Sequence, residues 1–137
     1  MRTKVAVVAS LGLFLVAAPV LAHHAFAAEF DSTKPIKLRG TITKVEFINP
    51  HAWIHIDVKD ADGKMVSWMV EGGSPNALYR RGVTKDSLAA GTEVVVEGYL
   101  AKSGENKANG ADVTFTDGRK LFLGSSNTGA PGEKSAK

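Results

Sequence analysis

The sequence predicts an all-β domain with one short helix, in the form of a small OB-like barrel of five strands. Several segments rich in β-branched residues alternate apolar and polar side chains, and turns containing glycine separate them. A single capped helical segment falls between the third and fourth of these strands, which is where an OB-type barrel carries its helix. An open β-sandwich is the alternative.

The first 22 residues have the pattern of an export signal. Arg2 and Lys4 precede an apolar run from Val5 to Val16, and small or compact residues follow at 17–22. The run is shorter than the roughly 20 apolar residues that a membrane-spanning helix needs. We therefore expect residues 1–22 to be a removable signal peptide rather than a retained anchor. The protein would then be periplasmic, without membrane association after cleavage.

Composition narrows the classes of function. Loss of the signal peptide removes two of the 17 basic side chains and leaves 15 against 14 acidic ones, a net charge of about +1. Binding to nucleic acid needs a concentrated basic face, so we expect no nucleic-acid partner. The sequence has no cysteine, which excludes disulfides, cysteine nucleophiles and thiolate metal sites. An apolar core must stabilise the domain, and the chain is long enough for one core.

The chain after the signal divides into an arm, a domain and a tail. Phe26 and Phe30 lie four positions apart and can anchor the arm to the domain. The last residues are rich in glycine, serine and lysine, a composition typical of disorder. We therefore assign residues 23–35 to the N-terminal arm, residues 36–124 to the OB-like domain and residues 125–137 to a disordered tail.

The first strand is expected from Ile36 to Phe47, after a segment with turn composition, and it should bend. Its apolar residues share one parity up to Ile42 and take the other parity from Val45. A β-bulge near Thr43-Lys44 would keep both sets on one face. Gly40 removes a side chain in mid-strand, as expected where a strand bends tightly around a barrel.

The second and third strands, about residues 52–60 and 64–71, form a hairpin whose register follows from the pattern. A two-residue loop would place the aliphatic residues on the same face as Ser67 and Glu71, whereas a three-residue loop, residues 61–63 with Gly63 left-handed, gives one apolar face. The pairs on that face are Ile54 with Val70, Ile56 with Trp68 and Val58 with Val66, and those on the other face are Trp53 with Glu71, His55 with Met69 and Asp57 with Ser67. We expect Trp68 in the core and Trp53 on the other face.

A short helix is expected at residues 74–82, because Ser74 can cap it, Pro75 suits its first position and Gly82 can end it. The fourth strand is predicted at residues 92–102. A polar loop at 103–110 then leads to a final hairpin with strands at 111–116 and 119–123.

Four motifs resemble those of a family of small exported bacterial proteins, a domain of unknown function. They are Ala22-His23-His24-Ala25-Phe26, Asn49-Pro50-His51, Gly73-Ser74-Pro75-Asn76 and Asp117-Gly118-Arg119. The resemblance covers roughly Ala22 to Gly124. It implies membership of the family and no activity, so the functional expectations come from residue chemistry.

All four histidines lie in two clusters, His23 with His24 and His51 with His55. If cleavage follows Ala22, His23 offers a free α-amine and a ring nitrogen to one metal ion, a chelate that suits Cu(II) or Zn(II). A third imidazole would complete the set. His51 and His55 are about 13 Å apart along a regular strand, at roughly 3.3 Å per residue, so one of them is a better candidate than both. We therefore predict a copper or zinc site formed by the N-terminal histidines and one strand histidine, with hydrogen-bonded structural histidines as the alternative.

A metal-free binding function is the rival hypothesis. Trp53, His55, Met69 and Glu71 fall on the face of strands two and three that OB barrels use for ligands. An exposed tryptophan there can stack on a small ligand or on a side chain of a periplasmic partner protein. Met69 opposite His55 would favour Cu(I) if it were recruited as a ligand. In a third hypothesis this face has only a structural role, because the N-terminal arm covers it.

An enzymatic activity has little support in the sequence. We find no nucleophile elbow, no phosphate-binding loop, no paired-carboxylate signature and no zincin spacing. Ser74 is better explained as a helix cap than as a nucleophile. We therefore predict no catalytic residue and favour a binding protein over an enzyme.

Overall fold

A computed structural model describes residues 26–124 and residue 131. The predicted signal peptide, His23, His24 and all of the predicted tail except Pro131 lie outside the described residues. Within residues 26–124, no helix has the length and apolar character needed to cross a bilayer.

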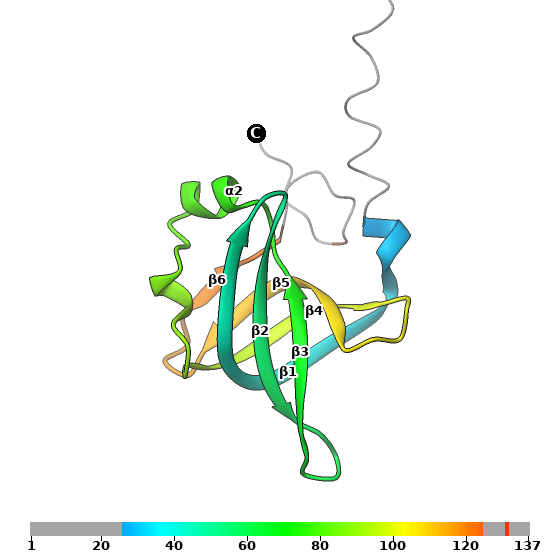
Figure 1. Cartoon of the computed structure of the whole chain (residues 1–137). Helices are drawn as coiled ribbons and strands as arrows, with labels where there is room; N and C mark the ends of the chain where they lie inside the picture. The colour runs from blue at the N-terminus through cyan, green and yellow to red at the C-terminus, as the bar shows by residue number, and fades with distance from the viewer. Residues whose placement is uncertain (1–25, 125–130, 132–137) are drawn as a thin grey trace, which may run out of the picture.

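The described part of the chain consists of a helical turn at residues 26–29, strands, and two short helical segments between β3 and β4 (Figure 1). In chain order these elements are β1 Phe30–Ile48, β2 His51–Lys59, β3 Met65–Glu71, α2 Pro75–Arg80, η1 Asp86–Leu88, β4 Glu93–Ala101, β5 Lys107–Phe115 and β6 Lys120–Phe122. All six strands belong to one sheet in the order β3-β2-β1-β4-β5-β6, and an additional pairing of β3 with β5 closes five of them into a ring. The all-β class is confirmed, and a single closed sheet differs from the two layers of a sandwich.

Strand pairing confirms the predicted bend in β1 and corrects its start. The β1–β2 register shifts between Ile42 and Lys44, as a bulge there requires. However, β1 begins at Phe30 rather than at Ile36. The segment between them has the composition of a turn, and the Asp31 side chain does accept a local hydrogen bond from the Thr33 amide at 2.9 Å. The backbone nevertheless stays extended. Its pairing with β4 is interrupted between Phe30 and Pro35.

The β2–β3 hairpin has the predicted register throughout. All six predicted cross-strand pairs are present. Gly63 adopts the left-handed conformation, with φ of 81°, and the loop projects away from the ring (Figure 1). Helix α2 is also built as predicted: the Ser74 side chain accepts from the Ala77 amide, Pro75 occupies the first turn, and Gly82 has a φ of 78°. A two-residue turn, Asn49-Pro50 with a cis peptide bond, joins β1 to β2.

The predicted polar loop at residues 103–110 is wrong in its second half, because β5 begins at Lys107. Residues 107–109 pair in parallel with residues 69–71 of β3 and close the ring. The alternation of apolar residues did not indicate this first part of β5, because Ala108 is the one apolar side chain among residues 107–110. Gly110 also permits the closure, since a Cβ atom there would lie 2.6 Å from a side-chain carbon of Val70 on β3.

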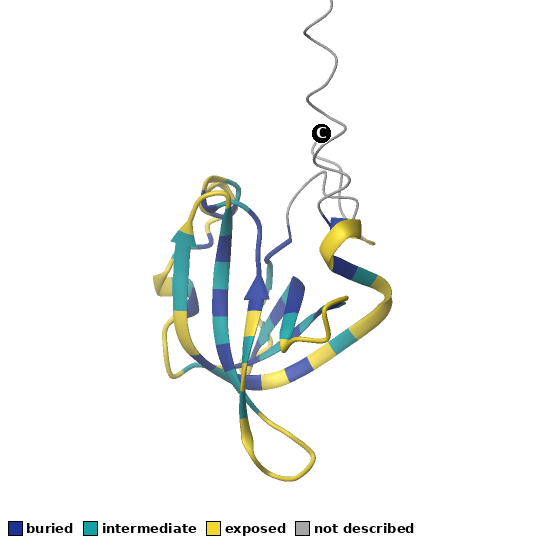
Figure 2. Ribbon diagram, turned by 45° about the vertical axis from the view of Figure 1, so that its right-hand side comes forward, coloured by how far each residue is buried: buried dark blue, intermediate teal, exposed yellow. Residues whose placement is uncertain are grey.

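The core lies inside the ring, and Figure 2 shows buried and less buried residues alternating along its strands. Its fully buried large side chains are Ile42, Ile54, Ile56, Val70, Leu78, Val83, Leu88, Val94, Val96, Val113 and Leu123. A second, smaller cluster packs Phe26 and Phe30 against Ala101 and Tyr99. This cluster anchors the arm to β4, as the spacing of the two phenylalanines suggested.

Trp68 differs from the prediction. It is half-buried at the edge of the core rather than within it, and Trp53 on the other face is also half-buried. Trp68 lies outside the short stretch of β3 that β5 covers, which begins at Met69. Trp53 is partly covered by Lys107, which belongs to β5.

Candidate functional site

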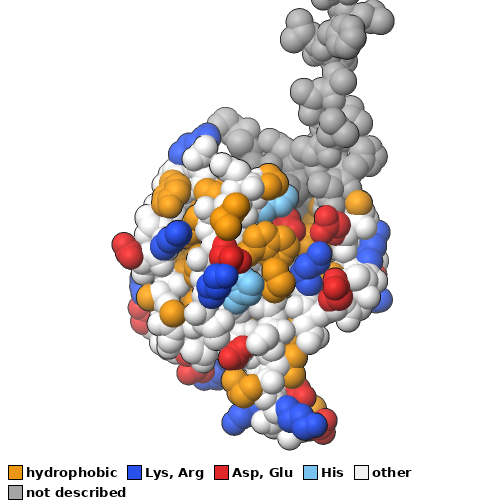
Figure 3. Space-filling model, viewed as in Figure 1, with side chains coloured by type: hydrophobic (Ala, Val, Ile, Leu, Met, Phe, Trp, Pro, Cys, Tyr) orange, Lys and Arg blue, Asp and Glu red, His pale blue; other side chains and the backbone are white. Residues whose placement is uncertain are grey.

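The candidate site is the outer face of β1, β2 and β3, opposite the core. We define this outer face by Glu46 from β1, His51, Trp53 and His55 from β2, Met69 and Glu71 from β3, and Lys107 from the start of β5. Trp53 lies at its centre, because it pairs with Glu46 on one side and with Glu71 on the other. In Figure 3 two histidines flank an apolar patch that acidic and basic side chains border.

His51 and Glu71 form the first of two imidazole–carboxylate pairs. The Nδ1 atom of His51 lies 3.0 Å from Oε1 of Glu71, with side-chain exposures of 31% and 10%. Burial raises the pKa of the Glu71 carboxyl, and the negative charge of Glu29 raises it further, while the positive charges of His51 and Lys107 oppose the shift. Because the pair uses Nδ1, Nε2 is the nitrogen that His51 can offer to another ligand.

His55 and Glu46 form the second pair on the other side of Trp53. The Nε2 atom of His55 lies 2.8 Å from Oε2 of Glu46, and Oε1 of the same carboxylate lies 2.6 Å from Nζ of Lys44. Hydrogen bonds from Lys44 and His55 lower the pKa of the Glu46 carboxyl, and the bond from Lys44 has the larger effect. Here the engaged nitrogen is Nε2, which leaves Nδ1 as the nitrogen for a further contact.

The two strand histidines therefore serve separate places on the outer face. Each is held by a different carboxylate, and Trp53 lies between them in the strand. Within residues 26–124 no three histidine, aspartate or glutamate side chains are grouped closely enough to hold a metal ion. His23 and His24, the other predicted ligands, lie outside the described residues.

Lys107 connects the arm to the outer face. Its Nζ atom lies 5.9 Å from the centre of the Trp53 ring, 5.8 Å from that of the Phe30 ring and 3.3 Å from Oε2 of Glu29. Distances of this size allow a cation–π interaction with each ring. The amide of Lys102 also donates to the Glu29 carbonyl oxygen at 2.8 Å, which fixes the arm to the end of β4.

Sequence reasoning placed Trp53, His55, Met69 and Glu71 on one face correctly but missed three charged neighbours. Glu46 could have been found, because it has the opposite parity to the inward-facing Val45 and Phe47. Lys107 was assigned to a loop, and Glu29 to an arm of unknown path. No local pattern indicates that these two side chains meet beside β2.

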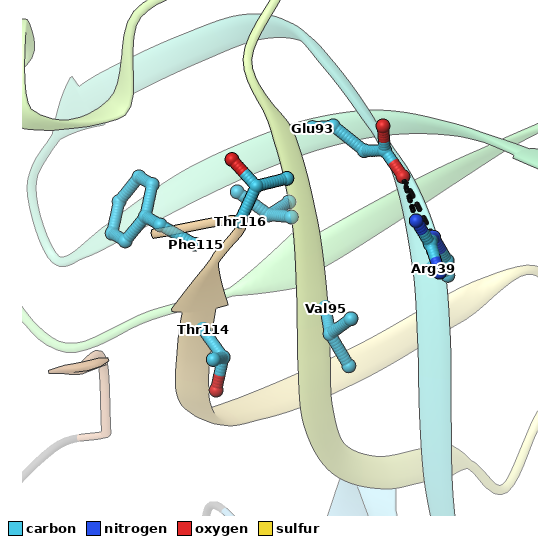
Figure 4. A pocket seen from close by; sticks show the side chains of 7 residues that line it. Arg39, Glu93, Val95, Thr114, Phe115 and Thr116 are labelled. Atoms are coloured by element: carbon cyan, nitrogen blue, oxygen red, sulfur yellow. Dashed lines mark hydrogen bonds and ion pairs between the residues drawn. The ribbon is translucent and has the colours of Figure 1, made fainter. Parts of the chain in front are cut away.

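Two of the hollows on the described surface lie around Arg39 and Glu93. One is lined by Arg39, Glu93, Val94, Val95, Thr114, Phe115 and Thr116, and its neighbour by Arg39, Gly40, Thr41, Asp57, Lys59, Met65 and Glu93. In Figure 4 the Arg39 guanidinium and the Glu93 carboxylate pair with each other, and their closest atoms are 2.6 Å apart. Since these charges satisfy each other, we place the candidate site on the outer face.

Comparison with known proteins identifies a family but no function. Residues 11–111 match the profile of a family described as a family of unknown function (DUF6152). Searches of curated proteins and of solved structures gave no significant match.

Proposed function

The chain belongs to this family of unknown function, and we propose that it is an exported periplasmic protein that binds a divalent copper or zinc ion through His51 and the N-terminal histidines His23 and His24. Support comes from the chemistry of the His51 pair and from the position of the arm.

The contact between His51 and Glu71 is the observation that carries the proposal. Histidines that bind metals usually donate their other ring N–H to a carboxylate, which fixes the tautomer and makes the free nitrogen a better ligand. Glu71 is 8% exposed and meets Nδ1 of His51 at 3.0 Å. A buried carboxylate of this kind is an effective orienting group, because little water competes for it. His51 would bind the ion through Nε2.

The position of the arm supports a contribution from the N-terminus. Phe26 is anchored in the small aromatic cluster, at 5.6 Å from the Tyr99 ring. His24 and His23 precede it by two and three residues, so at roughly 3.6 Å per residue they lie within about 7 and 11 Å of its Cα atom along the chain. Glu29, in the same arm, is near enough to Glu71 to affect its pKa. The described part of the arm therefore has Glu29 on the side of the ring where the His51 pair lies.

This donor set suits particular ions. If cleavage follows Ala22, the α-amine and imidazole of His23 with Nε2 of His51 provide three nitrogen ligands, and the imidazole of His24 or a water molecule takes the fourth position. Nitrogen ligands favour Cu(II), which takes a tetragonal geometry, and Zn(II), which takes a tetrahedral one. The absence of cysteine removes thiolates from the competition.

Calorimetric titration with Cu(II) and Zn(II) tests the proposal. Protein that starts at His23 should bind one equivalent tightly, and the same protein with one additional residue before His23 should bind at least tenfold more weakly. His51→Gln should weaken binding by a similar factor, whereas the matched change His55→Gln should not. The same weak affinity for all four proteins would contradict the proposal. Metal-free binding of a ligand or partner protein at Trp53, His55, Met69 and Glu71 would then be the better hypothesis.

A further inference from the structure

We propose that His55 and Met69 form a second, softer metal site on the outer face, with a preference for Cu(I). It is independent of the divalent site proposed at His51, because it uses a different histidine, a different carboxylate and no N-terminal residue.

The hairpin register brings the two side chains together. His55 pairs directly with Met69 across β2 and β3. The Met69 amide donates to the Asn106 carbonyl oxygen at 3.0 Å, so it points toward β5 and away from β2. His55 and Met69 are therefore a non-hydrogen-bonded pair, the type in which Cα atoms are about 4.5 Å apart and the side chains are closest. Both side chains point away from the core.

The donor atoms match a soft monovalent ion. The hydrogen bond between Nε2 of His55 and Glu46 holds the imidazole and leaves Nδ1 for a metal. The Met69 side chain is 39% exposed, so an ion can reach its thioether sulfur. Thioether sulfur selects Cu(I) over divalent ions, and imidazole is a good ligand for copper.

Two ion pairs lie beside the proposed site. Lys44 lies opposite His55 on β1, and Lys107 lies opposite Met69 on β5. Each ammonium is paired with a carboxylate, at 2.6 Å with Glu46 and 3.3 Å with Glu29. The four charges of these pairs cancel, whereas the outward-facing neighbours Asp57 and Glu71 add carboxylates, so the preference for Cu(I) comes from the thioether donor.

The chain provides a matched control for the thioether. Met65 lies on the same face of β3 and is 59% exposed, but its partner on β2 is Lys59 rather than a histidine. Replacing either methionine by leucine keeps the volume and removes the sulfur, so the fold should tolerate both changes equally.

The test uses Ag(I), a redox-stable probe for Cu(I) sites, and Cu(I) itself in competition with a chromogenic chelator. The mature protein should bind one equivalent of each. Met69→Leu and His55→Gln should lower the affinity at least tenfold, and Met65→Leu should not. In a methyl-detected NMR titration with Ag(I), the Met69 methyl signal should shift and the Met65 signal should stay. Equal effects of the two leucine variants, or no effect of Met69→Leu, would overturn the proposal.

The two proposed sites can be tested independently of each other. An additional residue before His23, or His51→Gln, should weaken binding of Cu(II) and leave binding of Ag(I) unchanged. Met69→Leu should do the reverse. Loss of Ag(I) binding on N-terminal extension would show that the soft site is not separate and would overturn this inference, whatever the outcome for Cu(II).

Discussion

The two faces of β2 show two ways in which a sequence specifies structure. Inward-facing Ala52, Ile54 and Ile56 are at most 1% exposed and share one apolar interior. On the outer face, His51 and His55 each depend on one particular partner, Glu71 and Glu46 respectively. The core therefore requires a residue type at each position, whereas the outer face requires specific pairs. Substitutions on the two faces should have correspondingly different effects.

The largest effect is expected inside the ring. Ile56→Ala removes methyl groups from a position with 0% exposure and leaves a cavity, which should cost about 2–5 kcal/mol of unfolding free energy. Urea denaturation followed by circular dichroism gives this value. A loss below 1 kcal/mol would mean that the core can collapse around the cavity. The core would then be less tightly packed than the burial of its side chains suggests.

The two tryptophans should have smaller and unequal effects. Trp68 packs against the core from its edge, so Trp68→Ala should cost about 2 kcal/mol. Trp53 lies on the outer face and contacts Lys107, and Trp53→Ala should cost about 1 kcal/mol or less. The same urea titrations rank the two variants. Equal losses would show that the outer face contributes to stability as the core does.

The next effect concerns the charge of Glu71 and changes with pH. Because burial raises its pKa above the usual 4.5, the folded protein binds this proton more tightly than the unfolded chain does. The stabilisation is therefore present below about pH 4.5 and is lost as the pH rises through the folded pKa. Glu71→Gln keeps an oxygen acceptor for His51 and removes the charge. The variant should melt at a higher temperature than the wild type at pH 7, with the difference shrinking toward pH 3.

The smallest effect is expected at Glu46, with the opposite sign. Hydrogen bonds from Lys44 and then His55 lower its pKa, so its contribution to stability is present above about pH 4.5 and is lost as the pH falls. Glu46→Gln should lower the melting temperature slightly at pH 7 and not at pH 3. Thermal melts from pH 3 to 8 on both glutamine variants compare the two sides of Trp53 directly. Slopes of the same sign would contradict the assigned environments.

Local features of the fold were predictable because neighbouring residues determine them. Alternation and loop chemistry set the β2–β3 register, the left-handed Gly63 closes that loop, and Ser74 caps α2. The late start predicted for β5 and the central position predicted for Trp68 were wrong for a common reason. Both depend on where β5 meets β3, a contact between segments far apart in the chain.

The candidate site was predictable to the same extent as the fold. Parity placed Trp53, His55, Met69 and Glu71 on one face, since side chains alternate along a strand. Parity does not give the diagonal contacts that join His51 to Glu71 and His55 to Glu46, because side-chain rotamers decide these. Lys107 reaches Trp53 only because the ring closes.

Ring closure itself has a consequence for the dynamics of the outer face. The β3–β5 seam consists of three parallel residue pairs, whereas β2 and β3 are joined by seven antiparallel pairs across a short loop. Contacts between distant segments carry a larger loop-closure entropy, so this seam should form after the hairpin and open at a lower free energy than the rest of the sheet. Met69 and Lys107 are paired in that seam, and Lys107 carries the link to the arm. Local opening would therefore separate Met69 from Lys107 in a single cooperative step, while the arm stays anchored to β4 and β2 keeps its histidines in place.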